Sequence, residues 1–236
     1  MIGISEFSRN QKLSFDRGEL EGVLNELDYT PEKLVALFEK DFKREFSSNA
    51  GVWEKYTIKQ HTLMVLKQFD KYFNSIQLPL GIPHKFFRVM LVLHDIGKPE
   101  AIVRGGKQLQ YEYTKRLMIP ILSELKYTDQ EINIATALVS ADPIGSYLAK
   151  HNSAQKSAEI IHMMAGKSIL RTDWFFSLLH IYYMVDAGSY TQDAGGLKSL
   201  DFLFVFDERK KEMKFSPVYE KMMWDLLIHI KYLDVQ

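Results

Sequence analysis

The sequence contains no cysteine, no excess of charge of either sign and no long apolar run. The absence of cysteine excludes disulfides, thiolate metal ligands and a thiol nucleophile, and it agrees with a reducing compartment. Thirty Lys and Arg residues balance thirty Asp and Glu residues, so the chain lacks the overall positive charge that holds long nucleic acid. A local basic pocket for a small anion remains compatible with this balance.

The chain also lacks the usual signals for export or membrane insertion. Residues 1–20 carry charges throughout and have no apolar h-region, and no stretch has eighteen consecutive apolar residues. No Pro-, Gly- or Ser-rich linker divides the 236 residues, and no segment repeats. We therefore expect one cytoplasmic domain, 1–236, with no membrane partner and with an oligomeric state that the sequence leaves open.

Apolar residues recur at helical spacing along most of the chain. This pattern predicts an N-terminal helical extension over residues 1–54 and a helical core over about 55–190. Only residues 202–215 indicate strands, because two apolar segments flank a charged turn there, and a last helix is expected from Pro217 to about Leu233. The expected fold class is all-α, a helical bundle with one small β-hairpin near the C-terminus.

The most informative segment spans residues 89–99. Five consecutive apolar residues, 89–93, precede His94 and Asp95, and they predict a helix that is buried on nearly all sides. Gly97 and Pro99 predict that this helix ends there, with His94 and Asp95 in its last turn. A buried imidazole and carboxylate need polar partners, and a divalent metal would satisfy both.

Two other polar residues fall on predicted apolar helix faces, His61 and Asp186. Each has an ordinary interpretation, since His61 fits a hydrogen-bonded core histidine and Asp186 fits a carboxylate that reaches solvent or a basic partner near a helix end. Metal binding is the alternative that accounts for both. If Asp186 were distant from His94, Asp142 or Asp173 would be the next candidate.

A double glycine, Gly105-Gly106, stands between Arg104 and Lys107 and indicates a turn. Two interpretations stay open, a solvated loop and a loop that covers a substrate. In the second case Arg104 and Lys107 are candidate substrate-binding residues.

The order of these residues on predicted helices resembles the HD-domain superfamily of metal-dependent phosphohydrolases over residues 55–190. The segment from His94 to Pro99 is similar to the central motif of that family. The resemblance implies an HD-like helical bundle whose metal ligands are His61, His94, Asp95 and Asp186. It also implies that Lys98 lies near the substrate phosphate, with Asp95 and Lys98 as the candidate catalytic residues.

Two imidazoles and two carboxylates form a ligand set suited to one divalent ion of Mn, Fe, Co, Ni, Zn or Mg. HD proteins with two metals carry additional histidines, and this chain has Tyr111 and Tyr113 in one such stretch and no histidine in the other. We therefore expect a single ion.

The resemblance also implies an activity. Water activated by the metal would hydrolyse a nucleotide or a related phosphomonoester or cyclic phosphodiester. The alternative is a binding or regulatory module that keeps the HD fold without turnover.

Overall fold

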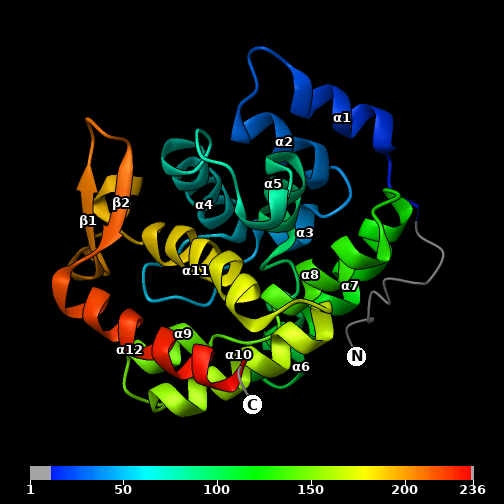
Figure 1. The fold of residues 1–236 in the computed structure, drawn as a ribbon. Coiled ribbons are helices and arrows are strands. Elements are labelled where there is room, and N and C mark those ends of the chain that lie inside the picture. The colour runs from blue at the N-terminus through cyan, green and yellow to red at the C-terminus, as the bar shows by residue number, and fades with distance from the viewer. Residues whose placement is uncertain (1–11, 235–236) are drawn as a thin grey trace.

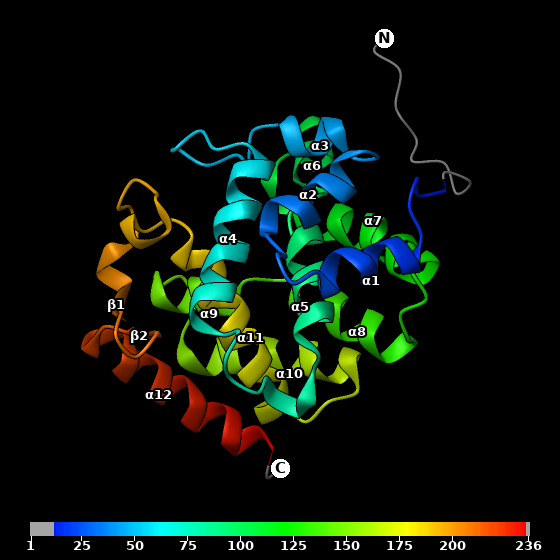
Figure 2. The same ribbon diagram turned by 90° about the horizontal axis from the view of Figure 1, so that it is seen from above.

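The computed structural model describes residues 12–234 (Figures 1 and 2). They are mostly helical, with a single two-stranded antiparallel hairpin near the C-terminus, which confirms the predicted fold class. The first half contains α1 (Arg17–Asn25), α2 (Pro31–Glu39), α3 (Lys43–Ser47), α4 (Ile58–Tyr72), η1 (Pro79–Gly81), α5 (His84–Leu93), α6 (Lys98–Arg104), η2 (Lys107–Leu109) and α7 (Gln110–Glu124). The second half contains α8 (Asp129–Leu138), α9 (Pro143–Leu148), α10 (Ala154–Ser168), α11 (Thr172–Gly188), η3 (Gln192–Ala194), η4 (Asp201–Leu203), β1 (Phe204–Asp207), β2 (Glu212–Phe215) and α12 (Pro217–Leu233).

Local capping chemistry sets where several helices begin. The Thr57 side chain accepts from the backbone N–H of Gln60 at the start of α4, and the Gln60 side chain accepts from the N–H of Thr57 in return. Thr128 and Glu131 form the same reciprocal pair at the start of α8. These pairs satisfy amides that the helix itself leaves without partners, so the helix starts are encoded locally.

Helices α4, α5 and α11 form the centre of the fold. Helix α4 packs against both α5 and α11, and Figures 1 and 2 show the three helices surrounded by the others. Every residue of α5 from Phe86 to Leu93 is buried, as its continuous apolar run predicts. The core that these helices share extends from Phe15 to Ile230.

The hairpin supports the C-terminal end of α11. In its register Phe204 pairs with Phe215 and Asp207 with Glu212. A Cβ on Gly188, the last residue of α11, would lie only 2.5 Å from Cε of Met213 in β2. The hairpin therefore packs closely on the helix end that carries Asp186.

One predicted helix end is wrong. Helix α5 ends at Leu93, and Pro99 stands in the first turn of a new helix, α6. A proline fits there because first-turn amides have no partner within the helix. Helix α10 contains Gly166 and ends at Ser168, and its C-cap, Ile169, is in the left-handed conformation.

Among residues 12–234, no helix has both the length and the apolar character needed to cross a membrane.

Candidate metal centre

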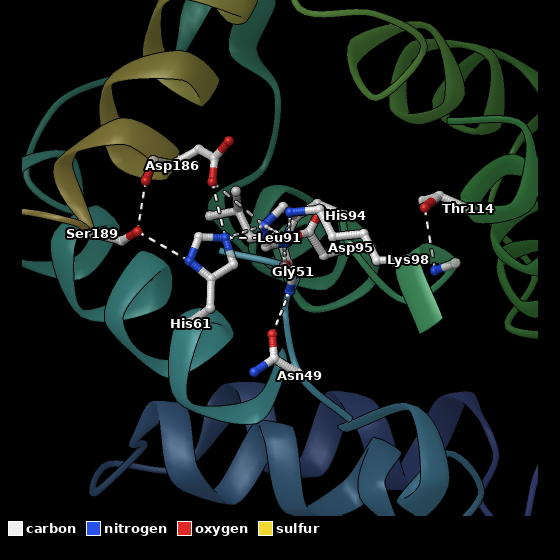
Figure 3. Close-up of polar contacts among 11 residues, drawn as sticks. Asn49, Gly51, His61, Leu91, His94, Asp95, Lys98, Thr114, Asp186 and Ser189 are labelled. Atoms are coloured by element: carbon white, nitrogen blue, oxygen red, sulfur yellow. Dashed lines mark hydrogen bonds and ion pairs between the residues drawn. The ribbon is translucent and has the colours of Figure 1, made fainter. Parts of the chain in front are cut away.

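Three central helices bring four predicted site residues together (Figure 3). His61 lies near the start of α4, His94 is the C-cap of α5 with Asp95 directly after it, and Asp186 lies in the last turn of α11. His61, His94 and Asp95 are buried, whereas the side chain of Asp186 is 34% exposed. His94 and Asp186 follow His61 by 33 and 125 residues in the sequence, yet the three side chains meet at one point.

The nitrogen and oxygen atoms of this group face one another. Nε2 of His61 lies 3.1 Å from Nε2 of His94, 3.3 Å from Oδ2 of Asp95 and 3.0 Å from Oδ1 of Asp186. Nε2 of His94 lies 3.6 Å from Oδ2 of Asp95 and 3.7 Å from Oδ1 of Asp186. The carboxylate of Asp186 is therefore close to both imidazoles, and the fallback to Asp142 or Asp173 is not needed.

These separations match the spacing of ligands around an ion. At metal–ligand distances of about 2.1 Å, neighbouring ligand atoms lie about 3.0 Å apart in an octahedron and about 3.4 Å apart in a tetrahedron. His61, His94 and Asp95 offer ligand atoms that all lie within 4.8 Å of one another, so they form a buried group that could hold a metal ion.

The second nitrogen of each imidazole has a fixed hydrogen-bond partner. Ser189 donates its hydroxyl proton to the backbone oxygen of Asp186, at 2.6 Å, so its Oγ accepts from Nδ1 of His61, at 3.1 Å. Nδ1 of His94 donates to the backbone oxygen of Leu91, at 2.5 Å. Nδ1 of each ring is therefore occupied by an oxygen partner, and Nε2 of each ring faces the group.

The electrostatics of the group favour a cation. Burial raises the pKa of Asp95, but Lys98 and the two imidazoles outweigh burial and hold this pKa below its usual range. Burial acts in the same way on Asp186, but the His61 and His94 imidazoles beside it outweigh burial and hold its pKa well below the usual value. Burial lowers the pKa of His61, yet Asp186 and Asp95 outweigh it and raise this pKa.

Lys98 lies beside the group at the start of α6. Its ammonium forms an ion pair with Oδ2 of Asp95, and only 8% of the residue is exposed. The preceding turn depends on Gly97, because a Cβ there would come 2.1 Å from the backbone nitrogen of Thr114 in α7. The N–H of Gly97 donates to Oγ1 of Thr114 at 3.2 Å. Close packing of α7 on this glycine thus fixes the segment that carries Asp95 and Lys98.

A cavity of about 250 Å³ opens beside the group. His94, Asp95, Lys98 and Asp186 line it. Its other lining residues include Lys107 and Asp142, together with four tyrosines, Tyr111, Tyr182, Tyr183 and Tyr190. Burial raises the pKa of each of these phenols, so they stay protonated at neutral pH.

Arg104 and Lys107, the two cations beside the glycine turn, have different surroundings in the structure. Lys107 lines the cavity, but Arg104 does not, because its guanidinium pairs with Glu100 at 2.7 Å. Asp173 lies away from the cavity and pairs with Arg171. The role of Arg104 in substrate binding stays a prediction.

Sequence reasoning missed two contributors to the site. Ser189 follows Asp186 by three residues, a spacing that puts both on one face of α11, and this spacing was the available signal. Tyr190 stacks on the His61 ring with centroids 4.9 Å apart. The sequence gives no local signal for that contact, since it depends on how the chain turns after α11.

Comparisons of this chain with protein-family models, with curated proteins and with solved structures found no match.

Proposed function

We propose that this protein is a metal-dependent phosphohydrolase of the HD type that acts on a small phosphoester, such as a nucleotide or a related phosphomonoester or cyclic phosphodiester. The observation that carries this proposal is the 3.1 Å separation of the Nε2 atoms of His61 and His94. Nδ1 of each ring is held by an oxygen, so both Nε2 atoms are available to bind one cation. A divalent ion between the two Nε2 atoms would bind both, in place of the proton that the raised pKa of His61 favours.

The proposed ligands limit which metal ions the site can bind. His61, His94, Asp95 and Asp186 supply two neutral nitrogens and two carboxylates, which suits one ion of Mn, Fe, Co, Ni, Zn or Mg. Such an ion, when bound, lowers the pKa of a water ligand and polarises a phosphoryl group. A phosphoester fits this chemistry because its oxygens are hard ligands and its charge is negative.

The protein's own residues supply the remaining contacts. Lys98 holds a positive charge on the cavity wall, where it can stabilise negative charge that builds on phosphoryl oxygens. The protonated phenols of Tyr111, Tyr182 and Tyr190 can donate hydrogen bonds to the same oxygens. Lys107 adds a second cation at the cavity. The cavity, at about 250 Å³, is slightly smaller than the usual range for ligand sites, which favours a compact substrate.

The proposal is tested by metal analysis of the purified protein followed by a phosphate-release screen over nucleoside phosphates and cyclic nucleotides. We expect one divalent ion per chain and hydrolysis of at least one member of the screen. His61→Ala should lose both the bound ion and hydrolysis. His151→Ala changes an exposed histidine between α9 and α10 and should keep both. Metal binding without hydrolysis of any member would instead support a binding or regulatory module.

A further inference from the structure

The segment 189–203, which follows α11, carries two residues that contact the metal centre. Oγ of Ser189 is hydrogen bonded to Nδ1 of His61 at 3.1 Å, and Tyr190 stacks on the same ring. Tyr190 and Leu200 also line the cavity. The segment contains only two short helices, η3 and η4. Its position beside His61 must therefore depend on contacts with the rest of the fold.

The carboxylate of Asp193, in η3, attaches this segment to α4. Oδ2 accepts from Nε2 of Gln68 at 2.9 Å, and Oδ1 accepts from Nζ of Lys71 and from the hydroxyl of Tyr72, both at 2.8 Å. Only 10% of the Asp193 side chain is exposed. All three donors lie on α4, the same helix that carries His61 near its start. One rigid helix therefore holds both the imidazole and the segment that supports it.

The turn between Asp193 and the metal centre is folded tightly on itself. The hydroxyl of Thr191 donates to the backbone oxygen of Gly188 at 2.6 Å. The backbone N–H of Gly196 donates to the backbone oxygen of Thr191 at 2.8 Å, and a Cβ on Gly196 would lie 2.9 Å from that oxygen. Such a turn has little freedom of its own. Holding Asp193 in place therefore also fixes Ser189, four residues earlier in the chain.

We propose that Asp193 is a positioning residue of the metal centre, whose carboxylate holds the segment 189–203 on α4 and thereby keeps Ser189 and Tyr190 against His61. This inference rests on the proposed function, since it concerns the ion that the proposed reaction needs. Asp193 does not line the cavity, so it acts on the ion through the orientation of His61. Hydrogen-bonded partners behind a metal ligand commonly set its affinity in this way.

The first test measures Mn²⁺ affinity by isothermal titration calorimetry after changes at each end of the attachment. Asp193→Ala removes all three hydrogen bonds, and we expect affinity to fall by about 10-fold. Asp193→Asn keeps one acceptor oxygen and should recover part of this loss. Tyr72→Phe removes a single donor and should lose less than Asp193→Ala. Its control is Tyr147→Phe, which removes a hydroxyl bonded to Asp225 and should keep wild-type affinity.

A second control separates positioning from stability alone. Asp70 also lies on α4, but its carboxylate pairs with Arg88 of α5 at 2.7 Å. Asp70→Asn and Asp193→Asn each weaken a largely buried ion pair, so both should lower the melting temperature of the metal-free protein. Only Asp193→Asn should weaken Mn²⁺ binding. Equal Mn²⁺ affinities for these two variants would show that Asp193 serves stability alone.

A double-mutant cycle tests the route through Ser189. If Asp193 acts by placing Ser189, the double variant Ser189→Ala/Asp193→Ala should lose less Mn²⁺ affinity than the product of the two single losses. Losses that multiply, or wild-type affinity in a folded Asp193→Ala, would overturn the proposal. Circular dichroism verifies folding, and Asp193→Asn replaces Asp193→Ala in the cycle if the alanine variant does not fold. A wild-type protein that binds no metal is a distinct result, which would overturn the proposed function together with this inference.

Discussion

Nε2 of His61 and Nε2 of His94 lie 3.1 Å apart, although the two residues belong to different helices and both are buried. Each ring has its Nδ1 hydrogen bonded to an oxygen, so neither Nε2 carries the proton of a neutral imidazole. The nearby carboxylates of Asp95 and Asp186 add negative charge to the same point. A cation bound at this point would contact both Nε2 atoms and both carboxylates.

Ser189→Ala tests the support of His61. Removing the hydroxyl leaves the Nδ1 proton of His61 without its acceptor, and we expect metal affinity to weaken by about 10- to 100-fold. Ser168→Ala is the matched control, because Ser168 is also buried and donates to a backbone oxygen within its own helix. Isothermal titration calorimetry with Mn²⁺ measures the metal affinity of both variants. Equal affinities for the two variants would show that Ser189 does not orient the ligand.

Gly97→Ala tests the close packing beneath the site. The added Cβ would meet the backbone of Thr114, so we expect the free energy of unfolding to fall by about 1–3 kcal/mol or more. Gly166→Ala should instead raise it by about 0.5–1 kcal/mol, since Gly166 lies inside α10 with no atom near the new Cβ. Urea unfolding followed by circular dichroism reports both changes. A neutral Gly97→Ala would contradict the close approach of α7.

His180 gives the fold a pH dependence of its own. Its ring stacks between Phe176 and Phe215, and burial lowers its pKa to about 4. The unfolded chain, with a histidine pKa of about 6.5, binds more protons below that pH, so stability should fall as the pH drops from 6.5 to 4. The loss contributed by this residue should reach on the order of 2–3 kcal/mol.

His180→Phe should remove this loss, because phenylalanine fills the same stack and has no titrating group. The exposed His151→Phe should leave the loss in place. Unfolding free energies at several pH values between 4 and 7 distinguish the two variants. If His180→Phe has the same pH dependence as wild type, His180 is not the source.

Lys98→Ala separates metal binding from catalysis. We expect metal content near normal and phosphate release lowered by roughly 10²- to 10³-fold, because the cation acts on charge that develops at the phosphoryl group. Asp95→Ala should lose both metal and activity. Lys167→Ala, which removes an exposed cation of α10, serves as the control. Turnover by Lys98→Ala at the wild-type rate would exclude the lysine from the mechanism.

Much of the fold was predictable because its determinants are local. Thr57 and Thr128 carry capping boxes, Pro217 starts the last helix at its observed position, and the hairpin lies within residues 202–215. Helix α6 was missed, because Pro99 was interpreted as the end of one helix when it stands in the first turn of the next. Proline fits both places, and only the packing around Gly97 distinguishes them.

The four residues that meet at the candidate site were predictable from the sequence, and their surroundings were less so. His61 and Asp186 were identifiable because polar side chains on apolar helix faces need a reason to be there. Their meeting with His94 depends on how α4 and α11 pack on each other, which no local pattern encodes. The same holds for Tyr190 and Asp142, whose places at the cavity follow from loop paths after α11 and before α9.

Metal removal and restoration on one preparation test the central claim most directly. The metal-to-protein ratio and phosphate release should be measured before treatment with a chelator, after it, and after the ion is added back. The account predicts one ion per chain, loss of phosphate release when that ion is removed, and recovery when it returns, with uptake accompanied by proton release because the pKa of His61 is raised. Phosphate release that is unchanged after complete removal of metal would contradict it.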